Sequence, residues 1–349
     1  MSHLIARKMT IPAADKARLR ILFLAKHANS GGRPSPVDGN HAAYHHELLT
    51  TMRAIGLNVE TADSFDPLFT SQHADWPRAD YIVTLLNRAG FLNSEMMGPL
   101  LATRSGIPFL GASPILRGLA DDKHLSRMAA VASGVPVARG ILLRRGGLAT
   151  SPRFSARRLI VKPNASSASW GVRIVEDWSS AYRHADVLHA QGHDALIEEW
   201  LPRHDVVVPV IGGPGGQPQI LPALQFSNHD PLSFRSYEEK RGLVPVECAD
   251  DLQAITDRTV VRRLKRYVDR MLPEFWPFDY GRFEFRYDAS TGRIAFMEIN
   301  VSCNLWSRKS VSRAAALAGL DHAALVETIL AHGLERQGLI AAQPLEVAA

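Results

Sequence analysis

Cysteine and long apolar runs are both scarce in this 349-residue chain. Its two cysteines, Cys248 and Cys303, cannot build the disulfide framework of a small secreted domain, and they fit a reducing compartment. No apolar run reaches the roughly 18–20 residues that a membrane-spanning helix needs. Residues 1–19 are mixed and polar, without the apolar stretch of a signal peptide. We therefore expect a cytoplasmic protein with no membrane partner, in which residues 1–19 form a flexible arm.

The chain also lacks a strong excess of charge of one sign. Its net charge is +5 and its pI is about 9.3, a modest basic excess that suits an anionic ligand such as a nucleotide. The densest basic cluster, residues 262–267, lies in a helical pattern and reads as a solvated helix face. No compact basic run with interleaved aromatic residues is present, so we expect no nucleic-acid partner. The composition, 46% hydrophobic and 21% charged, is typical of a globular protein with two or three domains.

Short apolar strands alternate with helical patterns in the first third of the chain. Residues 20–25, RILFLA, form the continuous apolar run of a buried parallel strand. Further strands are expected at 57–61, 81–86 and 107–111, with helices at 41–55 and 93–104. This alternation predicts a parallel α/β domain. Because ligands bind beyond the carboxyl ends of parallel strands, we expect a substrate near residues 26–40 and 87–93.

The rest of the chain mixes strands and helices. A helix at 121–133 begins with acidic residues, and 144–157 is expected to be a flexible connection. Residues 163–171, PNASSASWG, form a loop of small and hydroxyl residues that suits phosphate binding. We expect strands at 159–162, 195–200, 206–211 and 220–224, and helices at 178–190, 251–271, 311–319 and 323–333.

The most informative stretch is residues 281–304, which reads as two strands joined by a turn. Charged and aromatic residues alternate along the first strand, as in Arg282, Phe283 and Glu284. On the second strand Ile294, Phe296, Glu298 and Asn300 are expected on one face. If the connecting loop holds an odd number of residues, the even-numbered positions of both strands converge.

Two carboxylates, a carboxamide oxygen and a guanidinium then meet on that face. Hard oxygen ligands hold Mg²⁺, and an arginine supports developing negative charge, so this set suits a magnesium–phosphate centre. An ordinary amphipathic hairpin with a solvated charged face explains the same alternation.

Five motifs in the same order resemble the ATP-grasp superfamily, and within it the D-alanine–D-alanine ligase-like enzymes. They are DDK at 121–123, LIVKPN with SASWGV at 159–172, LIEEWL at 196–201, YEEK at 237–240, and GRFEFR with FMEIN at 281–300. The resemblance covers about residues 20–335. It implies an α/β (α+β ATP-grasp) fold, in which a parallel α/β domain precedes two ATP-grasp subdomains that clamp ATP. The implied divisions are an arm at 1–19, the α/β domain at 20–118, the small subdomain at 119–202, the C-terminal subdomain at 203–340 and a tail at 341–349.

The resemblance also implies a reaction and its cofactors. A carboxylate attacks the γ-phosphate of ATP to give an acyl phosphate, and an amine then displaces phosphate to form an amide. Glu284, Glu298 and Asn300 match the ligands of Mg²⁺, expected as two ions that Mn²⁺ can replace. Arg282 matches the arginine that supports charge on the reacting carboxyl. The expected partners are a small carboxylate and a small amine, and the resemblance leaves a homodimer open.

The nucleotide contacts follow from the same resemblance. Lys123 and Lys162 match lysines that contact the ATP phosphates, where they neutralise charge. Lys240 matches a mobile-loop lysine that closes over the γ-phosphate, and Ser169 a loop residue near the transferred phosphate. The strand edge that reads adenine through main-chain groups is matched by Glu198, Glu199, Trp200 and Leu201. Asp205 matches the acid that accepts the ribose hydroxyls. The side chain of Glu199 is expected to face solvent in part.

Three departures from the family pattern concern the metal and both substrates. The first metal ligand is Glu284 where the family has Asp. The loop after the first strand lacks the glutamate that binds an ammonium: Asp38 is its only acid, and Glu47 lies within the next helix. Where the family places a glycine and a small hydroxyl residue for the second substrate's carboxylate, this chain has Asn304, Arg308, Lys309 and Ser310.

These departures leave the ATP half intact and alter both substrate ends. We therefore expect an ATP-dependent carboxylate–amine ligase whose substrates are other than D-alanine. A genuine D-alanine–D-alanine ligase with diverged substrate loops and a non-catalytic ATP-binding protein are the alternatives.

Overall fold

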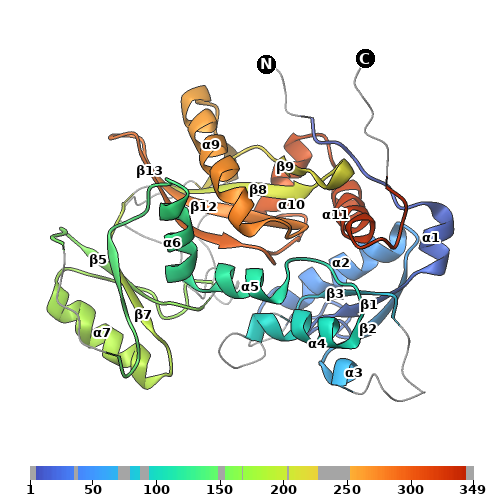
Figure 1. Ribbon diagram of the computed structural model, residues 1–349, viewed down its shortest axis with the longest axis horizontal. Helices are drawn as coiled ribbons and strands as arrows, with labels where there is room; N and C mark the ends of the chain where they lie inside the picture. The colour runs from blue at the N-terminus through green and yellow to red at the C-terminus, as the bar shows by residue number, and fades with distance from the viewer. Residues whose placement is uncertain are drawn as a thin grey trace.

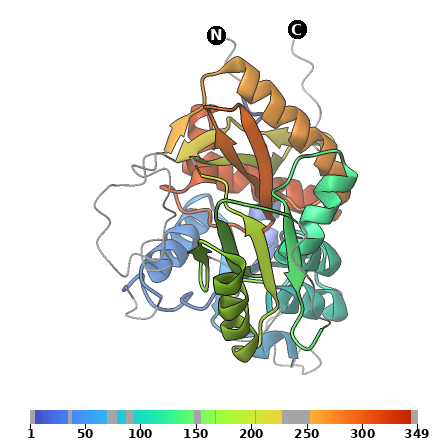
Figure 2. The same ribbon diagram turned by 90° about the vertical axis from the view of Figure 1, so that its left-hand side faces the viewer.

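The computed structural model of the protein describes residues 5–34, 38–69, 79–86, 94–147, 154–166, 168–202, 204–226 and 252–342. Three sheets organise these residues (Figure 1). A small antiparallel sheet with one covering helix stands apart from the rest. The N-terminal parallel sheet and the large C-terminal sheet lie next to one another, with helices of both units packed between them. Figure 2 shows the molecule from the end of the small sheet.

The N-terminal sheet has strand order β2-β1-β3 and is parallel, as the alternation predicts. Its elements are α1 Ala13–Arg18, β1 Arg20–Leu24, α2 His41–Ala54, β2 Asn58–Ala62, α3 Asp66–Phe69, β3 Tyr81–Thr84, η1 Ser94–Met96 and α4 Met97–Ser105. The expected strand at 107–111 is wrong, because this segment makes only an isolated bridge between Phe109 and Ile82. Pro108 cannot donate to a ladder, which limits pairing here.

Residues 5–19 are packed onto the C-terminal part of the molecule, and the expectation of a flexible arm is wrong for them. Met9 is fully buried, and its N–H donates to Thr328 Oγ1 at 3.1 Å. The Ile11 N–H donates to Glu327 Oε1 at 3.1 Å. Buried apolar side chains with satisfied backbone groups tie a terminus down.

Two helices lead from the first sheet to the small one: α5 Pro114–Asp121, which the sequence reading did not anticipate, and α6 Lys123–Ala132. Ser113 and Asp122 cap them by accepting hydrogen bonds from the N–H groups of Leu116 and Leu125. The small sheet then has strand order β4-β7-β5-β6, with α7 packed on one face. Its elements are β4 Gly140–Leu143, β5 Leu159–Pro163, β6 Arg173–Val175, α7 Trp178–Ala190 and β7 Ala195–Glu199.

The large sheet has strand order β11-β10-β8-β12-β13, with β9 also paired to β8. Its elements are β8 His204–Gly212, η2 Pro214–Gly216, β9 Pro218–Ile220, β10 Leu224–Phe226, β11 Leu252–Ala254, α9 Arg258–Phe275, β12 Tyr280–Asp288, β13 Arg293–Asn300, α10 Ser310–Leu317 and α11 His322–Arg336. The single strand expected at 220–224 is two shorter ones. The helix expected at 251–271 begins only at Arg258, because Asp257 caps its N-terminus and 252–254 pair in the sheet.

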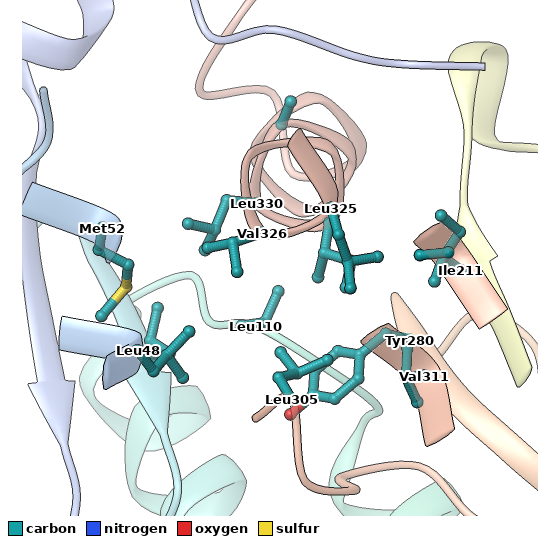
Figure 3. Packing of buried hydrophobic residues seen from close by; sticks show 14 of the residues in the cluster. Leu48, Met52, Leu110, Ile211, Tyr280, Leu305, Val311, Leu325, Val326 and Leu330 are labelled. Carbon is teal, nitrogen blue, oxygen red and sulfur yellow. The ribbon is translucent and has the colours of Figure 1, made fainter. Parts of the chain in front are cut away.

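Both faces of the large sheet are covered. Val206, Val208 and Val210 of β8 pack against α9, whereas Val207 and Ile211 face α10 and α11. The core on the α10 and α11 side of the sheet extends to α2 of the N-terminal unit. Figure 3 shows Leu48 and Met52 of α2 directed towards side chains of α11. The N-terminal and C-terminal units thus share one core, and the expected division at residues 118 and 202 stays a prediction.

No single helix within the described ranges is both long and apolar enough to cross a membrane. Only α10 and α11 taken together meet that test, across a break bent by 102°.

A buried carboxylate, Asp279, fastens the start of β12 to α11 and to the first unit. Its oxygens accept hydrogen bonds from His332 Nδ1 at 3.0 Å, from Arg336 Nε at 2.8 Å and from the Gly111 N–H at 2.7 Å. Burial raises the pKa of Asp279, but the hydrogen bonds from His332 and Arg336 outweigh it and hold the pKa below its ordinary value. Three segments distant in sequence therefore depend on one negative charge.

Replacing this charge should destabilise the whole protein. Asp279 has a φ of +61°, a conformation that asparagine also tolerates, so Asp279→Asn changes the charge with little backbone strain. We expect a loss of about 3 kcal/mol in the free energy of unfolding, measured by urea denaturation at pH 7, because Arg336 and His332 lose a buried anionic partner. The lowered pKa means that this stability is present above the unfolded-state pKa and is lost in acid, so the difference from wild type should shrink below about pH 4.

The matched control is Asp269→Asn. Asp269 pairs with Lys265 at 2.8 Å on the surface of α9 with half of its side chain exposed, so a change under about 1 kcal/mol is expected. Equal effects of the two substitutions would contradict the role given to Asp279.

Candidate active site

A β-bulge positions the charged residues of the β12–β13 hairpin. Asp288 pairs with Arg293, so the turn holds four residues. The even-numbered positions were expected to converge if the loop had an odd number of residues, and this condition is not met. The register then shifts at the bulge: Phe285 pairs with Phe296, but Glu284 pairs with Glu298, which skips Met297. The extra residue restores the convergence by a different route.

The bulge also divides the second strand between two faces. Arg282 pairs with Asn300 beside the Glu284–Glu298 pair, and all four of these residues line one cavity. Ile294 and Phe296 instead lie in the core beneath α9, so placing all four even-numbered positions of this strand on one face was wrong. The two carboxylates and the amide nevertheless lie together.

The cavity has a volume of about 380 Å³ and receives side chains from the segments that follow β1 and β3, from the other two sheets and from α6. Besides the hairpin residues, the predicted site residues that line it are Lys123, Lys162, Ser169, Asp205, Asp38, Asn304 and Lys309. Residues separated by more than 250 positions in sequence thus face one space. Their individual roles remain predictions.

Two ion pairs hold the charged groups of the hairpin face. Arg282 Nε contacts Glu284 Oε1 at 2.8 Å, and Nη1 of the same arginine donates to Ser310 Oγ at 3.4 Å. Burial lowers the pKa of Arg282, but the opposing effect of the nearby carboxylates, Glu284 first, is larger. The pKa is therefore raised overall, and the guanidinium stays charged. Across the strand pair, Lys123 Nζ lies 3.2 Å from Glu298 Oε2 and donates to the Ser166 carbonyl at 2.6 Å. Each carboxylate of the pair therefore has a cation beside it.

Lys162, at the end of β5, is buried against Glu198. That carboxylate also pairs with Arg127 of α6, whose Nε lies 2.6 Å from Glu198 Oε1. The side chain of Glu198 does not line the cavity and instead positions the lysine that does. Arg127 was missed by the sequence reading, because an arginine within a helix pattern gives no sign that it will be buried.

Next along the predicted adenine-reading edge, the side chain of Glu199 links the small sheet to the hairpin. Glu199 is buried, so its expected partial exposure is wrong: it binds Arg139 Nη2 at 2.8 Å and pairs with Arg293 of the hairpin. Burial raises the pKa of Glu199, but the hydrogen bonds from Arg293 and Arg139 give a net lowering. The side chains of Trp200 and Leu201 are not part of the cavity lining either.

Asp205, the expected ribose contact, has a partner that the sequence reading missed. Arg286 Nε lies 3.1 Å from Asp205 Oδ1, and its guanidinium lies 4.5 Å from the centre of the Trp200 ring. Arg286 occupies the next even position after Arg282 and Glu284 and lines the same cavity. The alternation of charged and aromatic residues along this strand already predicts that Arg286 shares a face with Arg282 and Glu284, so only its pairing with Asp205 was missed.

The loop after β5 carries two residues in the left-handed conformation, Ala168 with φ +55° and Ser169 with φ +61°. Such values are uncommon for residues other than glycine and gather at functional sites. Both residues line the cavity together with Ser166.

The expected substrate residues separate into two groups. Asp38, Asn304 and Lys309 line the cavity, whereas Arg308 and Ser310 do not. Arg308 stacks on the Trp306 ring at 4.3 Å. Ser310 is buried and contacts Arg282, as described above. Lys240, the expected mobile-loop lysine, lies outside the described residues.

The cavity also holds Cys303, which is buried. Burial is the largest of the effects that raise the pKa of this thiol to about 11. It is therefore protonated at neutral pH, as a thiol without nucleophilic activity would be.

The donor set suits a magnesium ion only if other ligands complete it. Among the described residues no group of three or more histidine, cysteine, aspartate or glutamate side chains is arranged to hold a metal. Glu284 and Glu298 face one another with the Asn300 amide beside them. Magnesium commonly takes one or two carboxylates and completes its shell with water and substrate phosphates, so these residues fit a magnesium–phosphate centre.

Known proteins of one family resemble this chain. The family model described as D-ala D-ala ligase C-terminus matches residues 152–331, more than half of the chain. The D-alanine–D-alanine ligase of Gluconobacter oxydans is 26% identical over 66% of this chain and 74% of its own length. D-alanine–D-alanine ligase B of Pseudomonas putida is 24% identical over 83% and 87%. An uncharacterized protein of Sinorhizobium fredii, y4sG, is 26% identical over 66% and 68%.

Solved structures establish the shared fold. The D-alanine–D-alanine ligase from Bacillus anthracis complexed with ATP matches with a TM-score of 0.69 at 15% identity, covering 92% of this chain and 99% of that one. The VanG D-Ala:D-Ser ligase from Enterococcus faecalis matches with a TM-score of 0.65 at 11% identity, covering 90% and 99%. The predicted fold class is confirmed. With the family model, these matches place the chain in the D-alanine–D-alanine ligase-like family of the ATP-grasp superfamily, and it is an ADP-forming ligase that makes a C–N bond.

Proposed function

We propose that this protein uses magnesium and ATP to join a carboxylic acid to an amine through an acyl phosphate, with substrates other than a pair of D-alanines. The observation that carries the reaction is the Glu284–Glu298 pair with Arg282, Lys123 and Lys162 around one cavity. Two carboxylates for a metal and three cations for phosphate and acyl oxygens are the groups that phosphoryl transfer from ATP requires.

Each residue has a part in this chemistry. Lys123 and Lys162 bind phosphate oxygens and lower the repulsion between the triphosphate and the incoming carboxylate. Glu284, Glu298 and Asn300 would hold the magnesium, which neutralises phosphate charge when bound. Arg282, fixed by Glu284 and Ser310, stabilises negative charge on the reacting carboxyl during both steps.

The proposed reaction has two steps, formation of an acyl phosphate and formation of the amide. A carboxylate oxygen bonds to the γ-phosphorus while the β–γ bridging bond breaks, and ADP leaves with its electrons. The amine nitrogen then attacks the acyl carbon, phosphate departs, and the nitrogen gives up a proton.

The substrate ends support an acid and an amine different from D-alanine. Glu47 is bound to the Trp306 Nε1–H at 2.9 Å and to the Ser307 N–H at 2.8 Å, and it does not line the cavity. It is therefore not placed to bind an ammonium group there. At the other end, Lys309 brings a cation to the cavity lining that suits an acidic group on the amine substrate.

A genuine D-alanine–D-alanine ligase with diverged loops is the second candidate. It is favoured by the names of the curated relatives, which are aligned over most of their length. The alternative of a non-catalytic ATP-binding protein is not retained, because the chain belongs to a family of ADP-forming ligases.

Removing one carboxylate of the pair should abolish turnover. Glu298→Ala removes a proposed metal ligand and the partner of Lys123, and we expect kcat for ADP release to fall at least about 10³-fold. Glu274→Ala, on the exposed side of α9, is the matched control and should leave kcat within about twofold. Near-normal turnover of Glu298→Ala would remove the metal assignment, and thermal unfolding of each variant shows whether the fold is retained.

The choice of substrates can be tested separately. With D-alanine as the only amino acid we expect ADP release near the background rate, and a screen of acid–amine pairs with mass spectrometry should identify a faster pair. For that pair, Lys309→Met should raise KM for the amine roughly tenfold, because a charge-assisted contact is lost. Arg308→Met, next in sequence but outside the cavity lining, should not. D-alanine turnover at rates typical of enzymes, about 1 s⁻¹ or more, would establish the second candidate instead.

A further inference from the structure

The N-terminal sheet contributes a distinct wall to the cavity. Lys26 and His27 lie just beyond β1, after Ala25, while Asp38 precedes α2 and His41 and His45 lie in its first two turns. All five side chains line the cavity that contains the hairpin carboxylates. We call these five residues the N-terminal wall.

The only acid of this wall is already neutralised. Lys26 Nζ lies 2.5 Å from Asp38 Oδ2, and His27 Nε2 donates to the same oxygen at 3.0 Å. Burial raises the pKa of Asp38, but the hydrogen bonds from Lys26 and His27 produce a net lowering. A substrate ammonium would have to compete with two cationic or proton-donating groups for one carboxylate, a poor binding site for a positive charge.

Glu95 is a second acid that reaches the N-terminal side of the cavity. It lies close enough to the buried guanidinium of Arg117 to raise the pKa of that group against the lowering caused by burial. This carboxylate, like Asp38, therefore faces a cation.

The remaining groups of the wall favour an anion. The backbone N–H of His27 donates to His45 Nδ1 at 3.3 Å, so a neutral His45 carries its proton on Nε2. His41 is the first residue of α2, a 14-residue helix whose N-cap side chain, Asn40, makes no capping hydrogen bond. The positive end of the helix dipole lies at this point and attracts negative charge.

We infer that the N-terminal wall binds a second carboxylate of the acid substrate, so that the acid activated by this ligase is a dicarboxylic acid. This inference rests on the proposed function. One carboxylate of the substrate attacks the γ-phosphorus at the hairpin, and the other stays at the wall beside Lys26 and the imidazoles. The first becomes the acyl phosphate and the second remains ionised throughout.

Hydroxylamine trapping tests this without knowledge of the amine. Hydroxylamine nitrogen attacks the acyl phosphate carbon, phosphate leaves, and a hydroxamate forms that is measured as its iron(III) complex. With magnesium and ATP, succinate or glutarate should give at least about tenfold more hydroxamate than butyrate or either enantiomer of alanine. Alanine or butyrate equalling the dicarboxylates would overturn the inference.

A charge-removing variant tests the wall itself. Lys26→Met should raise KM for the better dicarboxylate roughly tenfold, the effect of one charge-assisted contact, while KM for ATP stays unchanged. Lys265→Met is the matched control: its side chain is 54% exposed against 55% for Lys26, and it too pairs with an aspartate, but on the surface of α9. Equal KM values for the two variants would overturn the inference.

Binding separates this inference from the proposed function. Glutarate titrated calorimetrically into the protein with magnesium and a non-hydrolysable ATP analogue should give heat that is lost in Lys26→Met. Such binding without any hydroxamate supports the wall and counts against the ligase reaction. Hydroxamate formed from alanine but not from a dicarboxylate would support the ligase reaction and contradict the inferred role of the N-terminal wall. Absence of heat with both succinate and glutarate would also contradict that role.

Discussion

One extra residue in β13 decides where the charged groups of the hairpin lie. Without the bulge at Met297, Glu298 and Asn300 would share a face with Phe296 and enter the core beneath α9. Burying a carboxylate among phenylalanines without a partner costs several kcal/mol, and Ile299 would be turned out of that core. Apolar burial on one side and charge pairing on the other therefore select the same register. The bulge lets a single strand serve both the core and the cavity.

The cavity's charges are compensated before any ligand binds, and this shapes how magnesium and ATP would enter. Lys123 faces Glu298, Arg282 faces Glu284, and Lys162 faces Glu198. A triphosphate alone would pair with the lysines and leave their carboxylate partners without a cation. A metal ion alone would pair with the carboxylates and leave the lysines without an anion. A metal–nucleotide complex would replace both sets of partners at once, so that no charged group would be left without a counter-ion. The arrangement would thus favour the complex over either component.

Much of this site could be predicted from sequence, because strand alternation and the order of the lysines are local features. The sequence also carries a sign of the bulge, because the core residues Ile294 and Phe296 are even-numbered whereas the next one, Ile299, is odd-numbered. The partners of Glu199 and Asp205 could not be predicted. Arg293 and Arg286 reach them only through the pairing of distant strands, as Met9 reaches Thr328. Such contacts depend on tertiary structure, which propensity and spacing do not encode.

Glu47 joins the two substrate ends of the cavity. It belongs to α2, whose first turns form part of the N-terminal wall, and its carboxylate holds the indole of Trp306 and the backbone of Ser307. The segment that follows the hairpin and carries Asn304 and Lys309 is therefore fixed to the helix that would face the proposed acid substrate. Tyr44 of the same helix accepts a hydrogen bond from the Leu305 N–H at 3.1 Å. A shift of α2 that altered the acid subsite would move the amine subsite too. Under the proposed function the specificities for acid and amine would therefore be coupled through α2, while the lysines and carboxylates proposed to bind ATP and magnesium lie on other elements.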